Sequence, residues 1–334
     1  MSDAVDEGAN VGHGQGGEGP GSYGGHEPMD RDRRRETSRL GTEAEEAAIL
    51  QSPVPSPQSP EVKLALVQQP ATSDLDANLA RGLAAFDRAA DAGADLVAFA
   101  ELAFHPFWPQ RHATPETLAH AEPLDGPTVT AFRERAKARG VVAVLNIFER
   151  DGDQTFDSSP VIDADGSLLG VTRMIHITDY EAFHEQGYYA PGDHGLPVYD
   201  TEAGQIGVAI CYDRHYPEAM RALALSGAEV VIVPQAGAMG EWPDGLYEAE
   251  MRVAAFQNGY YTALVNRVGP EERLTFAGES FVCAPDGRVI ARAGEGTEEI
   301  LIVDLDLNAV PTSHARTLFL RDRRPDLYAD WLAR

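Results

Sequence analysis

The chain has 334 residues, of which 43% are hydrophobic and 24% are charged, so it is long enough to bury one large core or two smaller ones. Its formal net charge of -26 argues against a nucleic-acid partner and against an anionic membrane surface, because both bind through clustered lysine and arginine. Two cysteines, Cys211 and Cys283, are too few for a disulfide framework, and we expect a cytoplasmic protein with no secretion signal and no membrane span.

Residues 1–60 are rich in glycine, glutamate, serine and proline, as in GHGQGGEGPGSYGG at 12–25 and SPVPSPQSP at 52–60. Such a composition cannot bury enough apolar surface to offset the entropy of ordering the chain. We therefore expect a disordered tail.

From residue 61 onward, strand and helix patterns alternate. Ser73 and Asp74 are N-cap candidates for a first helix that Gly93 closes, and Pro127 opens a second helix. The predicted strands of this half are VKLALVQ (62–68), LVAFAE (96–101) and VVAVLNIF (141–148).

The second half continues the mixture, with a helix from Pro217 and another over 245–258. Its predicted strands are QIGVAI (205–210), VVIVP (230–234), YYTALVN (260–266), ESFVCA (279–284) and RVIARA (288–293). Asp-Gly pairs at 151–152, 165–166 and 286–287 predict tight turns, and therefore antiparallel neighbours. The pattern predicts one mixed α/β domain over 61–310, with two sheets facing each other, and a C-terminal extension at 311–334.

Cys211 is the first candidate for chemistry. It follows a buried strand and precedes a helix, so that CYDRHYP forms the connecting bend. Free backbone amides in such a bend lower the pKa of a thiol and can bind an oxyanion. The alternative is a small buried hydrophobic residue, which is the commoner fate of a lone cysteine.

Two glutamates strengthen the catalytic hypothesis. Glu101 and Glu149 each follow an apolar strand at its carboxyl end, where α/β sheets present their ligands. An acid in an apolar pocket has a raised pKa and can act as a general base toward a thiol. The alternative for each is an acid that pairs with an arginine or faces water.

Together these residues resemble the nitrilase, or carbon–nitrogen hydrolase, superfamily over almost all of 61–310. Glu101 matches the family's general base, CYDRHYPE matches its nucleophile bend, and Glu149 is placed at its second glutamate. Within the superfamily, the chain resembles the N-carbamoylputrescine amidase and β-ureidopropionase-like branches. Further matching segments are YYAPGD (188–193), LALSGAEVVIVPQA (223–236), QNGYYTALVNRVG (257–269) and GESFVCAPDGRVIA (278–291).

The resemblance implies a four-layer αββα sandwich of two mixed β-sheets and assembly into a homodimer or larger homo-oligomer, with residues 311–334 as a subunit contact. It implies hydrolysis of a small amide, ureido or nitrile substrate, in which Cys211 attacks, Glu101 takes the thiol proton and Glu149 positions the substrate. It implies no metal and no organic cofactor.

One position departs from the family pattern. Where the family has a catalytic lysine, this chain has Met174, and its only lysines are Lys63 and Lys137. Loss of an oxyanion donor lowers turnover by about 10²–10³. The candidates for compensation or substrate contact are the Tyr212 backbone amide, His176, Arg214, His215 and Tyr188, whereas Arg173 points away from Met174 on a regular strand.

Two other hypotheses are compatible with the sequence. A relative that has lost catalysis would keep the pocket for ligand binding or assembly, and Met174 is the observation in its favour. An acyltransferase would use the same nucleophile and differ only in its products.

Overall fold

A computed structural model of the chain describes residues 61–332, so the tail predicted at 1–60 lies outside the described residues. The first sheet is mixed: β1, β2 and β3 run parallel to one another, and the outer pairs are antiparallel. Its strands in spatial order are β15 (Glu299–Asp306), β1 (Glu61–Gln68), β2 (Leu96–Phe99), β3 (Val142–Val144), β5 (Gln154–Ile162) and β4 (Ile147–Asp151), with β6 (Leu168–Arg173) also paired to β5.

The second sheet is also mixed, with β8, β9 and β10 parallel in its centre. Its strands in spatial order are β14 (Val289–Arg292), β13 (Phe281–Cys283), β10 (Tyr261–Asn266), β9 (Val230–Gln235), β8 (Gly204–Val208) and β7 (Val198–Thr201). A two-stranded ribbon, β11 (Val268–Pro270) and β12 (Thr275–Ala277), lies outside both sheets.

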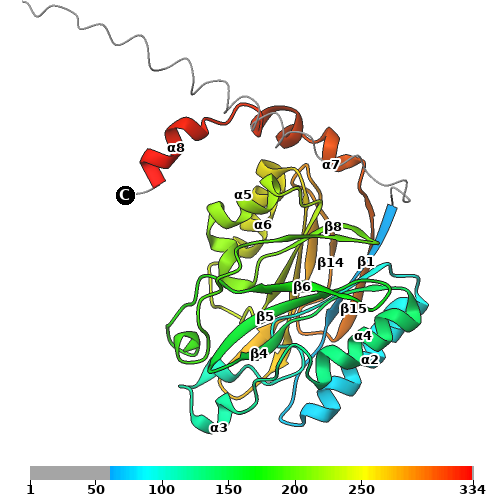
Figure 1. Ribbon diagram of the computed structural model, residues 1–334, viewed down its shortest axis with the longest axis vertical. Coiled ribbons are helices and arrows are strands. Elements are labelled where there is room, and N and C mark those ends of the chain that lie inside the picture. The colour runs from blue at the N-terminus through cyan, green and yellow to red at the C-terminus, as the bar shows by residue number, and fades with distance from the viewer. Residues whose placement is uncertain (1–60, 333–334) are drawn as a thin grey trace, which may run out of the picture. The chain divides into compact units, whose positions relative to one another are not determined.

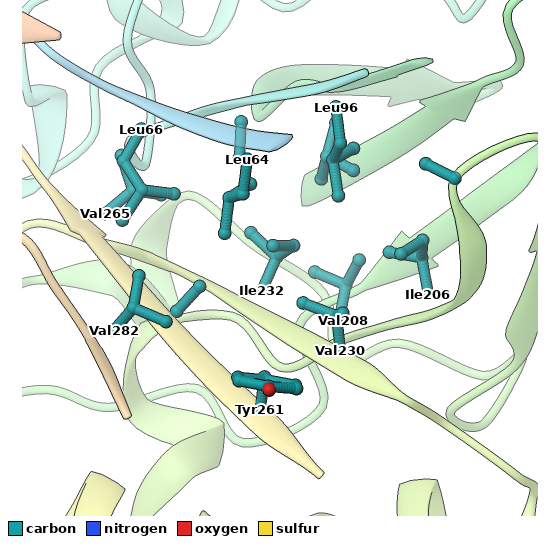
Figure 2. Close-up of a cluster of buried hydrophobic side chains, with 14 of the residues drawn as sticks. Leu64, Leu66, Leu96, Ile206, Val208, Val230, Ile232, Tyr261, Val265 and Val282 are labelled. Carbon is teal, nitrogen blue, oxygen red and sulfur yellow. The ribbon is translucent and has the colours of Figure 1, made fainter. Parts of the chain in front are cut away.

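The two sheets pack face to face through alternate residues of their strands. Leu64, Leu66 and Leu96 of the first sheet point toward Val208 and Ile232 of the second, and all five are buried (Figure 2). Because successive side chains of a strand point to opposite faces, the residues between these five are left for the outer faces.

Helices cover both outer faces, on opposite sides of the strands (Figure 1). Phe99 of β2 packs against Phe132 of α4 (Pro127–Arg139), which in turn packs against Phe86 of α2 (Leu75–Asp91). Met220 of α5 (Pro217–Leu225) and Met251 of α6 (Leu246–Asn258) are buried against the second sheet. The predicted four-layer αββα sandwich is confirmed.

Local sequence fixes the helix ends as predicted. The Asp74 side chain accepts a hydrogen bond from the Ala77 amide at 3.0 Å and caps α2. Pro127 is the first residue of α4, and Gly140 ends it with a φ of 66°, a left-handed conformation that glycine adopts without strain. The shorter helical segments are η1 (Trp108–Gln110), α3 (Pro115–Leu118), η2 (Glu185–Gly187), η3 (Cys211–His215), α7 (Ala309–Thr312), η4 (Ala315–Phe319) and α8 (Pro325–Leu332).

The structure differs from the sequence prediction at one strand that matters for the site. The segment 141–148, predicted as one strand, is two: β3 ends at Val144 and β4 begins at Ile147. Glu149 therefore lies inside β4, paired with Phe156 of β5, and not at the end of a strand. Strand β15, which pairs with β1 along its full length, was not predicted.

Within 61–332, no helix combines the length and the apolar character needed to cross a bilayer.

Candidate active site

Cys211 lies at the start of a sharp bend between β8 and α5. Its φ of 43° is left-handed, which a residue with a Cβ adopts only when its surroundings enforce it. Asp213 supplies part of that enforcement: its buried carboxylate accepts hydrogen bonds from the amides of Ile175 and His176, at 3.2 and 3.0 Å. The segment after β6 thus holds the bend in place.

Arg214 and Gln235 support the bend through a chain of hydrogen bonds. Arg214 Nη1 donates to the Cys211 carbonyl at 2.8 Å and to Gln235 Oε1 at 2.7 Å. The amide of Gln235, the last residue of β9, then donates to Cys211 Sγ at 3.3 Å. Arg214 also pairs with Glu250 of α6, so that its charge is engaged beneath the nucleophile. Gln235 was not singled out from the sequence, although it ends the strand beside β8 at the same sheet edge.

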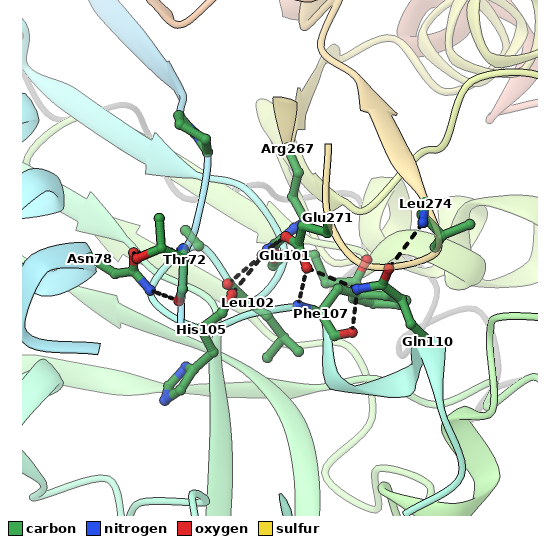
Figure 3. A network of polar contacts seen from close by, with 12 residues as sticks. Thr72, Asn78, Glu101, Leu102, His105, Phe107, Gln110, Arg267, Glu271 and Leu274 are labelled. Carbon is green, nitrogen blue, oxygen red and sulfur yellow. Dashed lines mark hydrogen bonds and ion pairs between the residues drawn. The ribbon is translucent and has the colours of Figure 1, made fainter. Parts of the chain in front are cut away.

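Glu101 follows β2 in a turn that a buried arginine holds. Arg267 donates to the carbonyls of Glu101, Leu102 and His105, and it pairs with Glu271 (Figure 3). Leu102 has a φ of 45°, so the chain reverses immediately after Glu101. Because of this reversal, the direction of the Glu101 side chain is not set by the alternation of side chains along β2.

Asn146 ties this turn to the neighbouring strand. It lies in the gap between β3 and β4, where its Oδ1 accepts from the Leu102 amide at 2.7 Å and its Nδ2 donates to Asp157 Oδ1 at 2.6 Å. The break in the predicted third strand therefore sets the spacing between Glu101 and Asp157.

Glu101, Glu185 and Cys211 converge. One carboxylate oxygen of each glutamate and the Sγ atom of Cys211 all lie within 4.8 Å of one another. Both glutamates are fully buried, and Cys211 is 5% exposed. Burial, with repulsion from Glu185, raises the pKa of Glu101 to about 8. Burial, with repulsion from both glutamates, raises the pKa of the Cys211 thiol, which Arg214 opposes.

Two more groups face these side chains. Asp157 of β5 is fully buried, and burial together with the negative charge of Glu101 raises its pKa. The Tyr189 hydroxyl is buried, and its pKa is raised by burial and by the charges of Asp157, Glu101 and Glu185. Of the tyrosine pair at 188–189, it is therefore Tyr189 that faces the carboxyl groups.

Glu149 does not join this group, which corrects its predicted place beside the nucleophile. It forms a buried ion pair with Arg173, whose Nε donates to Glu149 Oε2 at 2.9 Å. Ser158 Oγ donates to the same carboxylate. Glu149 and Ser158 share the face of the first sheet opposite to Asp157, because side chains alternate along β4 and β5. Glu185, near the start of η2, lies beside Cys211 instead.

The remaining predicted residues have other surroundings. His176 Nδ1 lies 2.7 Å from Asp213 Oδ1, and its ring stacks on Tyr216. Tyr188 packs against Phe148 in an apolar cluster that contains no residue of the nucleophile bend. Of the two, only His176 contacts the bend, as part of its scaffold.

Met174 is fully buried in the apolar cluster between the sheets that also contains Cys211. Its backbone amide donates to the Asp157 carbonyl at 2.9 Å, so it lies opposite Asp157, one residue past the end of β6. Tyr212 is half-buried and follows Cys211 directly, so its backbone amide is the first one after the nucleophile.

Glu101, Glu185 and Cys211 can perform acid–base and nucleophilic chemistry, since a thiol lies beside a carboxyl group of raised pKa. Among the residues at 61–332 they are also the only group of three acidic, histidine or cysteine side chains close enough to share a metal ion. Their oxygen and sulfur donors are ones that a divalent cation accepts.

Comparison with known proteins gives a consistent result. The model of the carbon–nitrogen hydrolase family matches residues 63–313. The chain is 35% identical to the N-carbamoylputrescine amidase of Solanum lycopersicum over 281 residues, which cover 80% of this chain and 93% of that protein.

Solved structures agree. A carbon–nitrogen hydrolase from Helicobacter pylori G27 superposes with a TM-score of 0.77 and 30% identity, covering 81% of this chain and 98% of that one. A variant of the amidase from Nesterenkonia sp. AN1 superposes with a TM-score of 0.69 and 27% identity, covering 84% of this chain and 100% of that one. In that structure the acetamide moiety of fluoroacetamide is added covalently at the active-site cysteine.

Proposed function

Because the chain belongs to the carbon–nitrogen hydrolase family, we propose that it cleaves an amide or N-carbamoyl group of a small linear substrate through a thioester on Cys211. The observation that carries the proposal is the convergence of the Cys211 thiol with the buried Glu101 carboxyl group.

In the first half of the reaction, ionised Glu101 takes the thiol proton, and Sγ attacks the carbonyl carbon. The carbonyl π electrons move to oxygen, where the Tyr212 backbone amide donates a hydrogen bond. Glu101 then gives its proton to the leaving nitrogen as the carbon–nitrogen bond breaks. Ammonia or an amine departs, and the acyl group remains on sulfur as a thioester.

In the second half, Glu101 takes a proton from water as the water oxygen attacks the thioester carbon. The tetrahedral species collapses, the carbon–sulfur bond breaks, and the proton held by Glu101 returns to sulfur. The Gln235 amide, 3.3 Å from Sγ, stabilises negative charge on sulfur each time it is the attacking or leaving atom.

The relatives support the substrate class. The tomato protein is an amidase of a carbamoylated amine by name, and the Nesterenkonia enzyme reacts with a small amide reagent at its cysteine. The buried carboxyl groups beside Cys211 favour a neutral amide or ureido carbon at the point of attack, because an anionic group placed there would be repelled.

Fluoroacetamide tests the nucleophile directly, with ammonia release from amides, ureido acids and nitriles as the activity assay. We expect intact-protein mass spectrometry to find an acetamide adduct on the wild type, and neither adduct nor turnover in Cys211→Ala. Cys283→Ala is the matched control, because Cys283 is buried in the second sheet and should leave both readouts unchanged. An adduct that survives in Cys211→Ala would refute the assignment.

A second candidate is a ligand-binding or assembly protein without turnover, favoured by the uncharged Met174 in the apolar cluster shared with Cys211. It predicts that the wild type releases no ammonia from any substrate and that Cys211→Ala binds ligands as the wild type does. Turnover that appears only in Met174→Lys would support this candidate.

A further inference from the structure

Three carboxyl groups and a thiol occupy one buried region of this protein. Glu101, Glu185 and Cys211 come within 4.8 Å of one another, and Asp157 adjoins Glu101 from β5. All three acids have zero exposure. Each buried ionic charge costs several kcal/mol unless a partner compensates it.

These acids lack compensating donors. Among the described residues, both oxygens of Glu101, both oxygens of Glu185 and one oxygen of Asp157 have no hydrogen-bond partner. Arg267 and Arg214, whose charges act on Glu101 and Cys211, have other partners: Arg214 pairs with Glu250, and Arg267 pairs with Glu271.

The other acids near Glu185 also oppose its ionisation. Asp157, Glu241 and Asp213 face it from β5, the loop after β9 and the nucleophile bend, and their charges oppose its ionisation. Tyr180 and Tyr189 face it as neutral hydroxyls. Burial is the largest cause of its raised pKa, and the Thr178 amide opposes that shift.

An ionised carboxylate only accepts hydrogen bonds, so neighbouring acids in a buried site bond to each other only when one of them carries a proton. Because carboxylates that share a buried site raise one another's pKa, three adjacent acids favour a state with one negative charge and two protons. Glu101 needs the charge to act as the base, which leaves the protons for Asp157 and Glu185.

We propose that Glu185, as a neutral carboxylic acid, donates a hydrogen bond to the oxyanion formed when Cys211 attacks, while neutral Asp157 donates to Glu101. This inference rests on the proposed function. Glu185 thereby supplies the donor that a positively charged side chain would otherwise provide. A carboxylic acid kept neutral by an apolar site is a known solution to the same problem.

The proton of Glu185 is shared and is not transferred. It stays on the carboxyl oxygen while the substrate C=O becomes C–O⁻, and it remains there when the oxyanion collapses. The travelling proton passes from sulfur to Glu101 and then to the leaving nitrogen. Glu185 thus returns to its starting state after each half-reaction.

Paired variants of Glu185 test this assignment. Glu185→Gln keeps the shape and a donor group, so we expect kcat within about tenfold of the wild type. Glu185→Ala removes the donor, and we expect kcat to fall by about 10²–10³. The wild type should lose activity at high pH as Glu185 ionises, and this alkaline limb should be absent in Glu185→Gln. Equal losses in both variants would overturn the proposal, provided that both melt like the wild type.

Infrared spectroscopy gives a readout independent of turnover. The difference spectrum between wild type and Glu185→Gln at pH 7 should contain the C=O stretch of a protonated carboxyl group. Absence of that band would overturn the neutral acid, as would a stoichiometric divalent ion found by elemental analysis of the purified protein. A wild type without turnover would instead refute the proposed function, whatever the spectrum shows.

Discussion

At the scale of single residues, the protonation of Glu101 should control the rate. A general base acts in its ionised form, and burial followed by repulsion from Glu185 raises the pKa of Glu101 to about 8. We therefore expect kcat/KM to rise about tenfold per pH unit below pH 8 and to level off above it, until the ionisation of Glu185 begins the alkaline decline.

Met174→Lys tests the direction in which this pH profile shifts when a positive charge is added. A nearby ammonium group favours the ionised carboxylate, so this variant should shift the acidic limb to lower pH. Initial rates measured across the pH range at low substrate concentration give both profiles. A wild-type limb near the ordinary carboxyl value of about 4 would contradict the raised pKa of Glu101.

The same scale separates Glu149 from catalysis. Its ion pair with Arg173 is buried, so Glu149→Ala leaves the Arg173 charge with only its exposed partners, Asp151 and Asp193, and should destabilise the fold by about 3–5 kcal/mol. The matched control is Asp151→Ala, which removes a partner of Arg173 that is 65% exposed and should cost less than about 1 kcal/mol. Urea denaturation measures both, and kcat of the folded Glu149→Ala fraction should stay near the wild-type value.

At the scale of elements, the turn after β2 depends on Arg267 of the segment between β10 and β11. One guanidinium group donates hydrogen bonds to three backbone carbonyls of this turn, those of Glu101, Leu102 and His105 (Figure 3). Arg267 contacts none of the reacting atoms, so it is a positioning residue. Without it the Glu101 carboxyl group is free to move relative to Sγ.

We expect Arg267→Lys to lower kcat by about 10²-fold, because a misplacement of about 1 Å has an effect of that size. An ammonium group cannot span the three carbonyls as the planar guanidinium does. KM should change much less than kcat, and alkylation of Cys211 by fluoroacetamide should slow in parallel. Equal changes in kcat and KM, or loss of the folded state alone, would argue against a positioning role.

At the scale of the whole molecule, the C-terminal segment predicts self-association. Arg316 anchors it, donating to the carbonyls of Ala224 and Ala228 at 2.9 and 2.8 Å. Phe319 packs on Phe256 of α6. Exposed apolar side chains lie on α6 and around the adjacent η4, namely Val253, Phe256, Leu318 and Phe319, and two more, Trp331 and Leu332, lie on α8. Clustered exposed apolar side chains such as those of α6 and η4 are typical of a protein–protein contact.

We expect a homodimer through this surface, and Val253→Asp combined with Phe319→Asp should convert it to monomers in light scattering after gel filtration. Leu169→Asp is the control, since Leu169 is an exposed apolar residue on β6. A wild-type monomer, or equal dissociation by the control, would contradict the assignment of this surface.

The sequence by itself determined most of the elements, their alternation and the candidates for nucleophile and base. Apolar runs, an N-terminal Asp74 cap, Pro127 and three Asp-Gly turns are local signals, and each predicts its element without reference to the rest of the chain. The nucleophile bend was equally readable, because its residues are contiguous around Cys211.

Only the tertiary structure decided which acids accompany Cys211. A break of two residues between β3 and β4 turned Asn146 toward Asp157, and the pleat then placed Glu149 on the opposite face. Glu185 and Gln235 reach the thiol from segments distant in sequence. Spacing along a chain reports local geometry, whereas the charge balance of a buried site is a sum over side chains that only folding brings together.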